Sequence, residues 1–534
     1  MKTMINSIIL ASCLALPLAS CSDSDAAPEQ KDWSTTTYFN SSDAAAQDTY
    51  YKPAVGYVGD PMPFFDPVAG DFKVLYLQDF RPNPEGTYHP IWGVSTKDAA
   101  HYTSLGELVS CGTKKSQDAA IGTGSTIYDE ASKLYYTFYT GNKYLPTGDE
   151  SAQAVMVATS PDFKTWTKDR TFLLKGQDFG YDKNDFRDPF VFKGDDGKFH
   201  MLISTKKGGK GSLAEFVSDD LKNWTDNGVF MTMMWDRFYE CPDLFKMGDY
   251  WYLVYSEIHH AVRRVQYFKG RTLDELKACT ANDAGIWPDA HEGFLDSRGL
   301  YAGKTASDGT NRYLWGWCPT RSGKDNTAVG ASPAEPEWGG NLVCYKLIQH
   351  EDGTLTLGQV DAVSEKYNQD VAVEVKESQN MTEADGIYTL AGNAEQPAYM
   401  LMGRLGNHNK ISFTVTTSNE WDKFGISMVR GSDSKKYYTM VVNPENENNR
   451  KVNFEEQGVE GKGFIAGIDG YVFARPADNV YNVTIYTDNS ICVMYINDVC
   501  SYTNRIYGIQ KNCWSINSYN GANVKISNLK ISQY

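Results

Sequence analysis

The sequence Phe238-Tyr239-Glu240-Cys241-Pro242-Asp243-Leu244-Phe245 sets one acid directly before a proline-containing run of apolar residues. The run at 252–255 that follows is apolar and aromatic, which is typical of a buried strand. Aromatic neighbours at the entrance to such a strand predict that the carboxyl group of Glu240 is desolvated, and desolvation raises the pKa of an acid. A carboxylic acid that stays protonated near neutral pH can act as a general acid.

An acid followed by proline occurs at two earlier positions as well. Asp60 lies in Gly59-Asp60-Pro61 and Asp188 lies in Arg187-Asp188-Pro189, each ahead of an aromatic or β-branched run. Proline restricts the residue before it to extended or turn conformations. We therefore expect all three acids to lie at the mouths of strands.

A weak internal repeat with a spacing of about 60 residues favours a β-propeller. Its copies are 94–98, 158–167 and 217–225, and the last two share an Asp and a Trp-Thr pair. Aromatic residues make up 13% of the chain, with 34 Tyr and 46 Gly, which favours many short strands and turns. The innermost strands of a propeller converge on a central channel. Acids on three different blades can therefore meet despite their distance in sequence.

The C-terminal part predicts a β-sandwich. After a polar junction at about 361–381, alternating or apolar runs are separated by Gly, Asn and Asp, and these runs are 410–415, 437–442, 481–486 and 491–496. A chain of 534 residues is too long for one ordinary domain. We expect a propeller over residues 51–362 and a sandwich over 363–534.

In their order and separation, the three acidic motifs resemble those of the family 32 glycoside hydrolases, which include invertases, inulinases, levanases and fructosyltransferases. The resemblance covers roughly 51–360 well and the remainder weakly. It implies an all-β protein with a five-bladed propeller and a C-terminal β-sandwich, in which Asp488-Asn489-Ser490 and Arg505-Ile506-Tyr507 have counterparts. It implies cleavage of β-fructosidic bonds with retention of configuration, without a metal or other cofactor.

The resemblance also implies a role for each acid. Asp60 would be the nucleophile that attacks the anomeric carbon of fructose, and Glu240 would protonate the leaving oxygen and then activate water. Asp188 would bind two fructose hydroxyl groups and, with Arg187, stabilise the oxocarbenium-like transition state. We expect the guanidinium of Arg187 to lower the pKa of Asp188.

Four further residues are predicted to bind substrate. Gln78 and Trp92 match family positions that line the fructose pocket, although Gln and Trp are also ordinary strand residues. Cys241 would either tune Glu240 or fill the core as a buried thiol. Thr123 lies in Gly122-Thr123-Gly124-Ser125, where the family has Phe-Ser-Gly-Ser.

The chain departs from the family pattern around the predicted nucleophile. Gly59 stands where the family has Asn, and Met62-Pro63 stands where it has Asn-Gly. With the change at 122–125, these departures remove a hydrogen bond and an aromatic wall near the reacting sugar. They argue against ordinary sucrose hydrolysis and favour a polymeric substrate or intramolecular fructosyl transfer.

The N-terminus predicts a lipoprotein signal peptide over residues 1–21. Lys2 and the apolar run 8–18 precede Leu18-Ala19-Ser20-Cys21, in which Cys21 would be acylated after cleavage. The acids that follow resemble export signals of surface lipoproteins in Bacteroides-like bacteria. Residues 22–50 predict a solvated tether. We expect a lipid anchor in the outer membrane, at the cell surface or in the periplasm, and no other membrane segment.

Charge and cysteine content narrow the range of partners. The net charge is -16, from 51 Lys and Arg against 67 Asp and Glu, which argues against nucleic acid or anionic lipid as a partner. We expect a monomer that binds a neutral oligo- or polysaccharide. The cysteines show no metal-binding spacing, and Cys492 with Cys500 is the one pair considered for a disulfide.

Three functions are compatible with these observations. The first is a retaining fructan hydrolase or fructosyltransferase, with levan or inulin and endo or exo attack left open. The second is an inverting five-bladed propeller enzyme, as in families 43 and 62, acting on arabinan or xylan. The third is a glycan-binding surface lipoprotein without catalytic activity.

Overall fold

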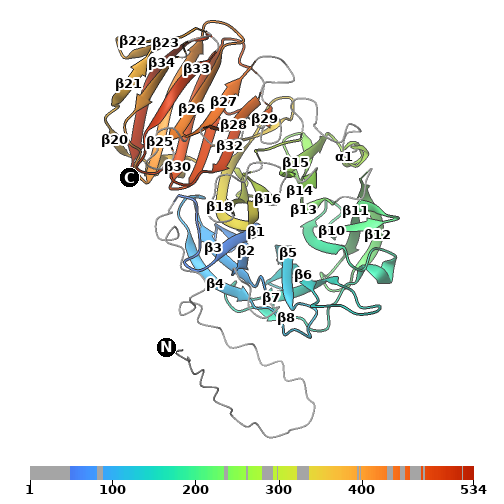
Figure 1. Cartoon of the computed structure of the whole chain (residues 1–534). Coiled ribbons are helices and arrows are strands. Elements are labelled where there is room, and N and C mark those ends of the chain that lie inside the picture. The colour runs from blue at the N-terminus through green and yellow to red at the C-terminus, as the bar shows by residue number, and fades with distance from the viewer. Residues whose placement is uncertain are drawn as a thin grey trace, which may run out of the picture.

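The computed structural model describes residues 49–80, 88–233, 238–259, 262–279, 293–297, 299–321, 336–393, 396, 398–429, 437–444, 451–457, 471–472, 475–519 and 521–534. These residues form two β-modules that lie side by side (Figure 1). The N-terminal strands, blue to yellow, surround a common axis, and the orange and red strands stack as two sheets. Within the described part of the chain, no helix has both the length and the apolar character that a membrane span requires.

The N-terminal module is a five-bladed propeller of antiparallel strands, as the repeat and the resemblance predicted. Strand β18 pairs with β1, which joins the fifth blade to the first and closes the ring. The blades are β1 (Tyr57–Asp66), β2 (Asp71–Asp79), β3 (Ile91–Thr96) and β4 (Thr103–Val109); β5 (Ala120–Asp129), β6 (Leu134–Asn142), β7 (Gln153–Ser160) and β8 (Thr167–Lys168); β9 (Phe186–Lys193), β10 (Phe199–Lys207), β11 (Lys210–Ser218) and β12 (Thr225–Thr232); β13 (Glu240–Met247), β14 (Tyr250–His259) and β15 (Val262–Gly270); and β16 (Tyr301–Ser307), β17 (Arg312–Arg321), β18 (Pro336–Gln349) and β19 (Leu355–Gly358). The 3-10 helix η4 (Gly176–Phe179) and helix α1 (Leu273–Ala278) lie in connections.

The first strand of each blade lines the axis. These strands are β1, β5, β9, β13 and β16, and each contacts the next around the ring. Glu240 lies at the mouth of its strand as expected, whereas Asp60 and Asp188 lie a few residues inside β1 and β9, at β-bulges. A bulge leaves one residue out of the hydrogen-bonding ladder, which suits a proline without an N–H group.

The C-terminal module is a β-sandwich, as predicted, entered through helix α2 (Asp361–Lys366). The junction expected at 361–381 contributes β20 (Gln369–Val371) and β21 (Val375–Gln379) to its sheets. One sheet contains β22 (Met381–Ala384), β23 (Ile387–Ala391), β34 (Asn523–Gln533), β25 (His408–Thr417), β30 (Val480–Asp488), β31 (Ile491–Ile496) and β32 (Cys500–Arg505), with β20 (Gln369–Val371) paired to β34. The other contains β21 (Val375–Gln379), β24 (Ala398–Met402), β33 (Trp514–Tyr519), β26 (Lys423–Val429), β27 (Tyr437–Asn443), β28 (Lys451–Gln457) and β29 (Tyr471–Val472).

A buried polar network joins the two modules. Arg505 of the sandwich donates hydrogen bonds to the backbone oxygens of Cys318 and Pro319, at 3.0 Å each. Asp296 of the propeller accepts hydrogen bonds from the backbone N–H and the hydroxyl group of Thr503. A buried charge needs such partners, because desolvation without them is costly. The network therefore fixes β17 against the sandwich, directly after Trp317.

The cysteine pair considered for a disulfide is not bridged. Cys492 and Cys500 are both free and buried. Their strands are neighbours, but the register pairs Cys492 with Asn504 and Cys500 with Ile496. The two thiols therefore do not lie opposite each other and pack as small core residues.

Candidate active site

Each innermost strand of the propeller carries a bulge. The register shifts fall between Gly59 and Pro61, Gly122 and Gly124, Glu240 and Asp243, and Tyr301 and Lys304, and opposite Asp188-Pro189 in β9. Three residues at these bulges have positive φ: Asp188 (57°), Cys241 (52°) and Ala302 (53°). Non-glycine residues held in this conformation cluster at functional sites. The bulges turn their side chains out of the normal strand alternation and bring them together.

Asp60 is held by two hydrogen bonds from other blades. The hydroxyl group of Thr123 donates to Oδ2 at 2.7 Å, and the indole N–H of Trp317 donates to Oδ1 at 2.9 Å. Both donor residues are buried. Each carboxylate oxygen has two acceptor sites, so the carboxylate is fixed in orientation and retains free lone pairs.

Glu240 is held in the same way, with one donor on each oxygen. Arg187 donates from Nη2 to Oε1 at 2.9 Å, and the hydroxyl group of Tyr301 donates to Oε2. Burial raises the pKa of Tyr301 well above its ordinary value, so this phenol keeps its proton. The Glu240 side chain retains 24% of its surface exposed. The predicted desolvation of this side chain is therefore only partial.

Asp188 is the buried acid of the group, with 5% of its surface exposed. Burial raises its pKa from 3.8 to about 6, against the opposing effects of the Arg187 charge and of the Cys241 N–H, which donates to Oδ2 at 2.9 Å. The charges of Glu240 and Asp60 raise this pKa further, which shows that all three acids lie in one electrostatic environment. The Arg187 charge lowers this pKa, as expected, but desolvation outweighs it and the pKa ends above its ordinary value.

Arg187 bridges two acids and does not serve Asp188 alone. Its Nη1 donates to Asp185 at 2.8 Å while Nη2 contacts Glu240, and its guanidinium lies 4.0 Å from the ring centroid of Phe238. Stacking on an aromatic face is a common way to fix this planar group. The contacts give Arg187 one defined position beside Glu240.

Trp338 occupies the space left by Gly59. A Cβ atom on Gly59 would lie 2.1 Å from a carbon of the Trp338 ring, closer than any real contact allows. The indole also stacks on His89, with ring centroids 4.1 Å apart and an interplanar angle of 19°. Its ring also lies 6.1 Å from that of Trp317, which binds Asp60. Trp338 of β18 therefore supplies an aromatic face beside Gly59.

Of the four residues predicted to bind substrate, two lie beside the acids and two lie on outer strands of the first blade. Thr123 binds Asp60, and Cys241 is buried, with its thiol facing Thr123 at 3.8 Å and its N–H bound to Asp188. Gln78 is fully buried on β2 and donates to the backbone oxygen of Val55. Trp92 lies on β3, two strands out from β1, with its ring edge-on to Phe80.

Sequence reasoning missed Tyr301, Trp317, Lys304 and Trp338. Lys304 is buried at the centre, where its ammonium donates to the backbone oxygen of Gly124 at 2.9 Å. Burial lowers its pKa. Tyr301 and Lys304 flank the bulge that lies one repeat after Cys241, so extending the spacing of about 60 residues to a fifth strand would have found them. No comparable signal marks the two tryptophans.

Comparison with protein families gives two matches that together span both modules. Residues 50–360 match the model of the glycosyl hydrolases family 32 N-terminal domain, and residues 353–531 match the model described as GH32, BT1760-like, C-terminal domain. The first of these covers more than half of the chain.

Individual relatives are more distant. The chain is 26% identical over 311 residues to the β-fructofuranosidase insoluble isoenzyme CWINV2 of Arabidopsis thaliana, covering 53% of this chain and 50% of the relative. It is 25% identical over 287 residues to the fructan 6-exohydrolase of Beta vulgaris, covering 50% of this chain and 46% of the relative. The chain thus spans about half the length of the curated relatives it matches. The exo-inulinase structure from Aspergillus awamori superposes with a TM-score of 0.67 at 16% identity, over 91% of this chain and 98% of that one, which shows a shared fold.

Proposed function

The chain belongs to glycoside hydrolase family 32, and from this premise we propose that it is a retaining enzyme that cleaves the β-fructosidic bonds of fructans. The observation that carries the proposal is the pairing of Asp60 with Trp317 and of Glu240 with Tyr301. The centroids of the Trp317 and Tyr301 rings lie 5.4 Å apart. Two carboxylates from different blades are therefore connected through one pair of packed side chains. Retaining glycosidases require two carboxyl groups about 5 Å apart.

Asp60 is our proposed nucleophile. Thr123 and Trp317 hold its carboxylate in one orientation, so its free lone pairs are available for attack on the anomeric carbon of a fructosyl unit. The attack forms a covalent bond from a carboxylate oxygen as the bond to the leaving oxygen breaks. When water later attacks the anomeric carbon, the Asp60 carboxylate is the leaving group, and the same two donors stabilise its returning negative charge, so they serve both steps.

Glu240 is our proposed acid and base. Its partly exposed carboxyl group protonates the leaving oxygen in the first step and takes a proton from water in the second. Tyr301 remains protonated throughout, because burial raises its pKa, and it keeps one Glu240 oxygen as an acceptor. The other oxygen faces Arg187 at 2.9 Å.

Asp188 is our proposed stabiliser of the transition state. With a pKa of about 6 it is charged at neutral pH, and an anion in a buried site stabilises a developing oxocarbenium charge strongly. Its N–H donates to Thr140 and one carboxylate oxygen accepts from Cys241, which leaves the second oxygen for sugar hydroxyl groups. Asp188 therefore binds the sugar and also places a negative charge in the pocket.

We propose levan or inulin as the substrate rather than sucrose. The Trp338 indole beside Gly59 gives this site an aromatic face next to the nucleophile, and such faces pack on the C–H patches of sugars. Fructan 6-exohydrolase and exo-inulinase among the similar proteins support the choice of a fructan. Fructosyl transfer to a sugar hydroxyl uses the same two carboxyl groups and remains the second candidate, favoured by the departures around Gly59.

Chromatography of the products from levan, inulin and sucrose tests this proposal. We expect free fructose or short fructose oligomers from at least one fructan, and a cyclic difructose or longer oligomers if a sugar acts as acceptor. Release of fructose from sucrose alone would contradict the fructan proposal. No product from any of the three would favour the glycan-binding protein without activity.

We further propose that the protein is anchored to the outer membrane through Cys21. The proposal comes from the lipoprotein motif Leu18-Ala19-Ser20-Cys21. Residues 1–48, which hold the motif and most of the predicted tether, lie outside the described part of the chain. Thr49 and Tyr50, the last two residues of the predicted tether, are buried, and their backbone N–H groups donate to Asp488, so the prediction of a solvated tether is wrong for these two residues. The proposal is consistent with a polymeric substrate, which must be cut before it can be taken up.

A further inference from the structure

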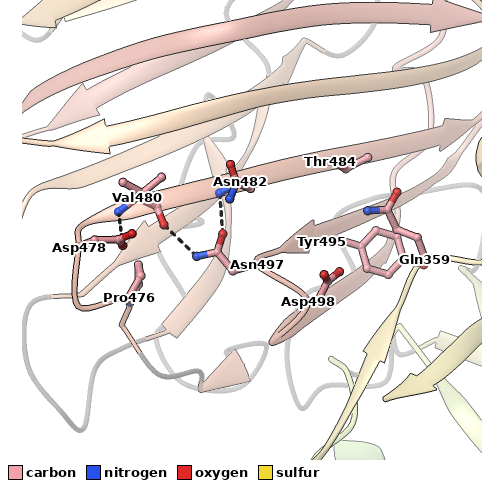
Figure 2. Close-up of a pocket in the computed structure, with 9 residues that line it drawn as sticks. All are labelled: Gln359, Pro476, Asp478, Val480, Asn482, Thr484, Tyr495, Asn497 and Asp498. Atoms are coloured by element: carbon pink, nitrogen blue, oxygen red, sulfur yellow. Dashed lines mark hydrogen bonds between the residues drawn. The ribbon is translucent and has the colours of Figure 1, made fainter. Parts of the chain in front are cut away.

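A groove of about 400 Å³ lies on the sandwich, at the edge that faces the propeller. Its floor is formed by β30 and β31, and Gln359, which follows the last propeller strand, closes one end (Figure 2). Figure 2 shows Tyr495, Gln359 and Asp498 gathered at that end and Asp478 at the other. A groove of this volume is within the range of small-ligand sites, and nothing assigned to the catalytic centre lies in it.

The frame of the groove is held by its own hydrogen bonds. Asn497 accepts from the backbone N–H of Asn482 at 2.7 Å and donates to the backbone oxygen of Val480 at 2.9 Å. Asp478 accepts from the backbone N–H of Val480 at 3.0 Å. These side chains are occupied by the backbone, so the groove is preformed and need not be ordered by a ligand.

Tyr495 is the residue that points to a ligand. Only 4% of its surface is exposed, yet it lines the groove, and its hydroxyl group has no hydrogen-bond partner among the described residues. Burial raises its pKa well above the ordinary value, so the hydroxyl group stays protonated and can both donate and accept. Its hydroxyl group is not among the fully buried polar atoms that lack a partner, so it is this end of Tyr495 that reaches the groove. A ligand hydroxyl or a water molecule in the groove can bind it.

The other free polar groups define the chemistry of that ligand. Thr484 and the amide nitrogens of Gln359 and Asn482 line the groove without partners among the described residues, whereas the Gln359 oxygen accepts from Tyr486 at 2.7 Å. The carboxylate of Asp498 adds an acceptor and a negative charge. Mixed donors and acceptors beside negative charge suit a neutral ligand with many hydroxyl groups and disfavour an anion.

An exposed tryptophan stands beside the other end. Pro476 lines the groove and follows Arg475, whose guanidinium lies 6.0 Å from the ring centroid of Trp421. Trp421 is 44% exposed. Aromatic rings exposed on a surface are common platforms for sugar rings, so a chain leaving the groove past Pro476 would meet one.

We propose that this groove is an accessory binding site for a neutral oligosaccharide segment, separate from the catalytic centre, which holds a polymer while its end or an internal bond is cut. If the proposed function is right, the segment belongs to the same fructan. The groove holds sugar units by hydrogen bonds from Tyr495, Thr484 and Gln359. Its effect is to raise the effective concentration of the polymer at the propeller.

The test compares two double variants of the full chain. Thr484→Val with Tyr495→Phe removes two hydroxyl groups from the groove and keeps the ring contacts of Tyr495 with Tyr345 and Tyr486. Thr382→Val with Tyr388→Phe removes the same groups from β22 and β23 of the same sheet. As a third variant, Thr484→Arg fills the groove from a partly exposed strand position.

Binding is measured first, by gel retardation in levan, inulin, arabinan and dextran, with Glu240→Gln added to every chain so that the polymer is not degraded. We expect the double groove variant to bind the retarding polymer about four- to hundredfold more weakly, from about two- to tenfold for each of two hydrogen bonds lost. The control variant should bind the polymer as tightly as the parent does. Removal of metal ions with EDTA should change neither value. Equal retardation of groove variants and parent, retardation lost on adding EDTA, or no retardation of the parent by any polymer would overturn the proposal.

Activity is measured next, with Glu240 intact. The groove variants should hydrolyse a fructosyl trisaccharide within twofold of the parent and show a raised KM for the polymer. An equal loss on both substrates would overturn the accessory site. Retardation by arabinan or dextran that the groove variants lose would support the groove and refute the fructan assignment. The proposal of an accessory groove and the proposal of a fructan substrate can therefore fail separately.

Discussion

Replacing Asp188 by asparagine should make the protein more stable and nearly inactive. The change removes the charge of a side chain that is 5% exposed while keeping its shape and its capacity to accept from the Cys241 N–H. Burial is the main reason that its pKa is raised to about 6, so the folded protein holds the charged form at a cost. Active sites commonly carry such costs, because the charge is needed for the reaction.

The size of the effect follows from the pKa. The rise from 3.8 to about 6 means that the folded state binds the proton more tightly than the unfolded state, so stability falls as pH rises between these values. Each unit corresponds to about 1.4 kcal/mol, which gives a cost of about 3 kcal/mol at pH 7.5 and less than about 1 kcal/mol at pH 4. Asp188→Asn should recover this cost.

Urea unfolding of the parent and of Asp188→Asn at pH 7.5 and pH 4 provides the assay. We expect the variant to gain about 3 kcal/mol at the higher pH and little at the lower, and to lose about 10²-fold or more in turnover. A control variant, Asp361→Asn, changes an exposed acid and should shift neither value. A variant that gains nothing at pH 7.5, or gains the same at both pH values, would refute the reasoning about burial.

Three further predictions test the site and its setting. Glu240→Ala should lose about 10²- to 10⁴-fold in turnover on fructans, the usual effect of losing a general acid and base, and activity within threefold of the parent would contradict its role. Gly59→Asn should lower activity at least about tenfold, because the new Cβ would overlap the Trp338 ring. Adding Trp338→Ala should recover part of the loss. Unchanged activity of Gly59→Asn alone would show that the Trp338 ring can move aside. Cys21→Ala should release the protein from the membrane fraction, and continued cofractionation with membranes would show that the motif is misread.

Much of the fold and part of the site could be predicted from local sequence. The motifs Asp60-Pro61, Asp188-Pro189 and Glu240-Cys241-Pro242 mark three inner strands, because a proline in a bulge leaves a trace in the sequence. The repeat of about 60 residues predicts the blades, since each blade must complete its own sheet before the next begins. These signals come from residues that are close in sequence.

The groups that hold the acids could not be predicted in this way. Trp317 reaches Asp60 from the fifth blade, and Thr123 reaches it from the second, so their contacts depend on closure of the ring. Gly59 indicated that the Asn side chain typical of the family is absent here, but only the structure shows that Trp338 fills its space. The pKa of Asp188 depends on a balance between burial and the charge of Arg187, and the sequence shows the neighbour without showing the burial.

The central claim is that Asp60 and Glu240 cleave fructans by double displacement, and the configuration of the first-formed product tests it most directly. Proton NMR, recorded within the first minutes of levan or inulin hydrolysis and before mutarotation, reports the anomer of the fructose released. If Asp60 is the nucleophile, two successive inversions give fructose with the β-configuration of the donor. If water attacks directly, with Asp60 as base, the first-formed fructose is the α-anomer, and this result would contradict the mechanism.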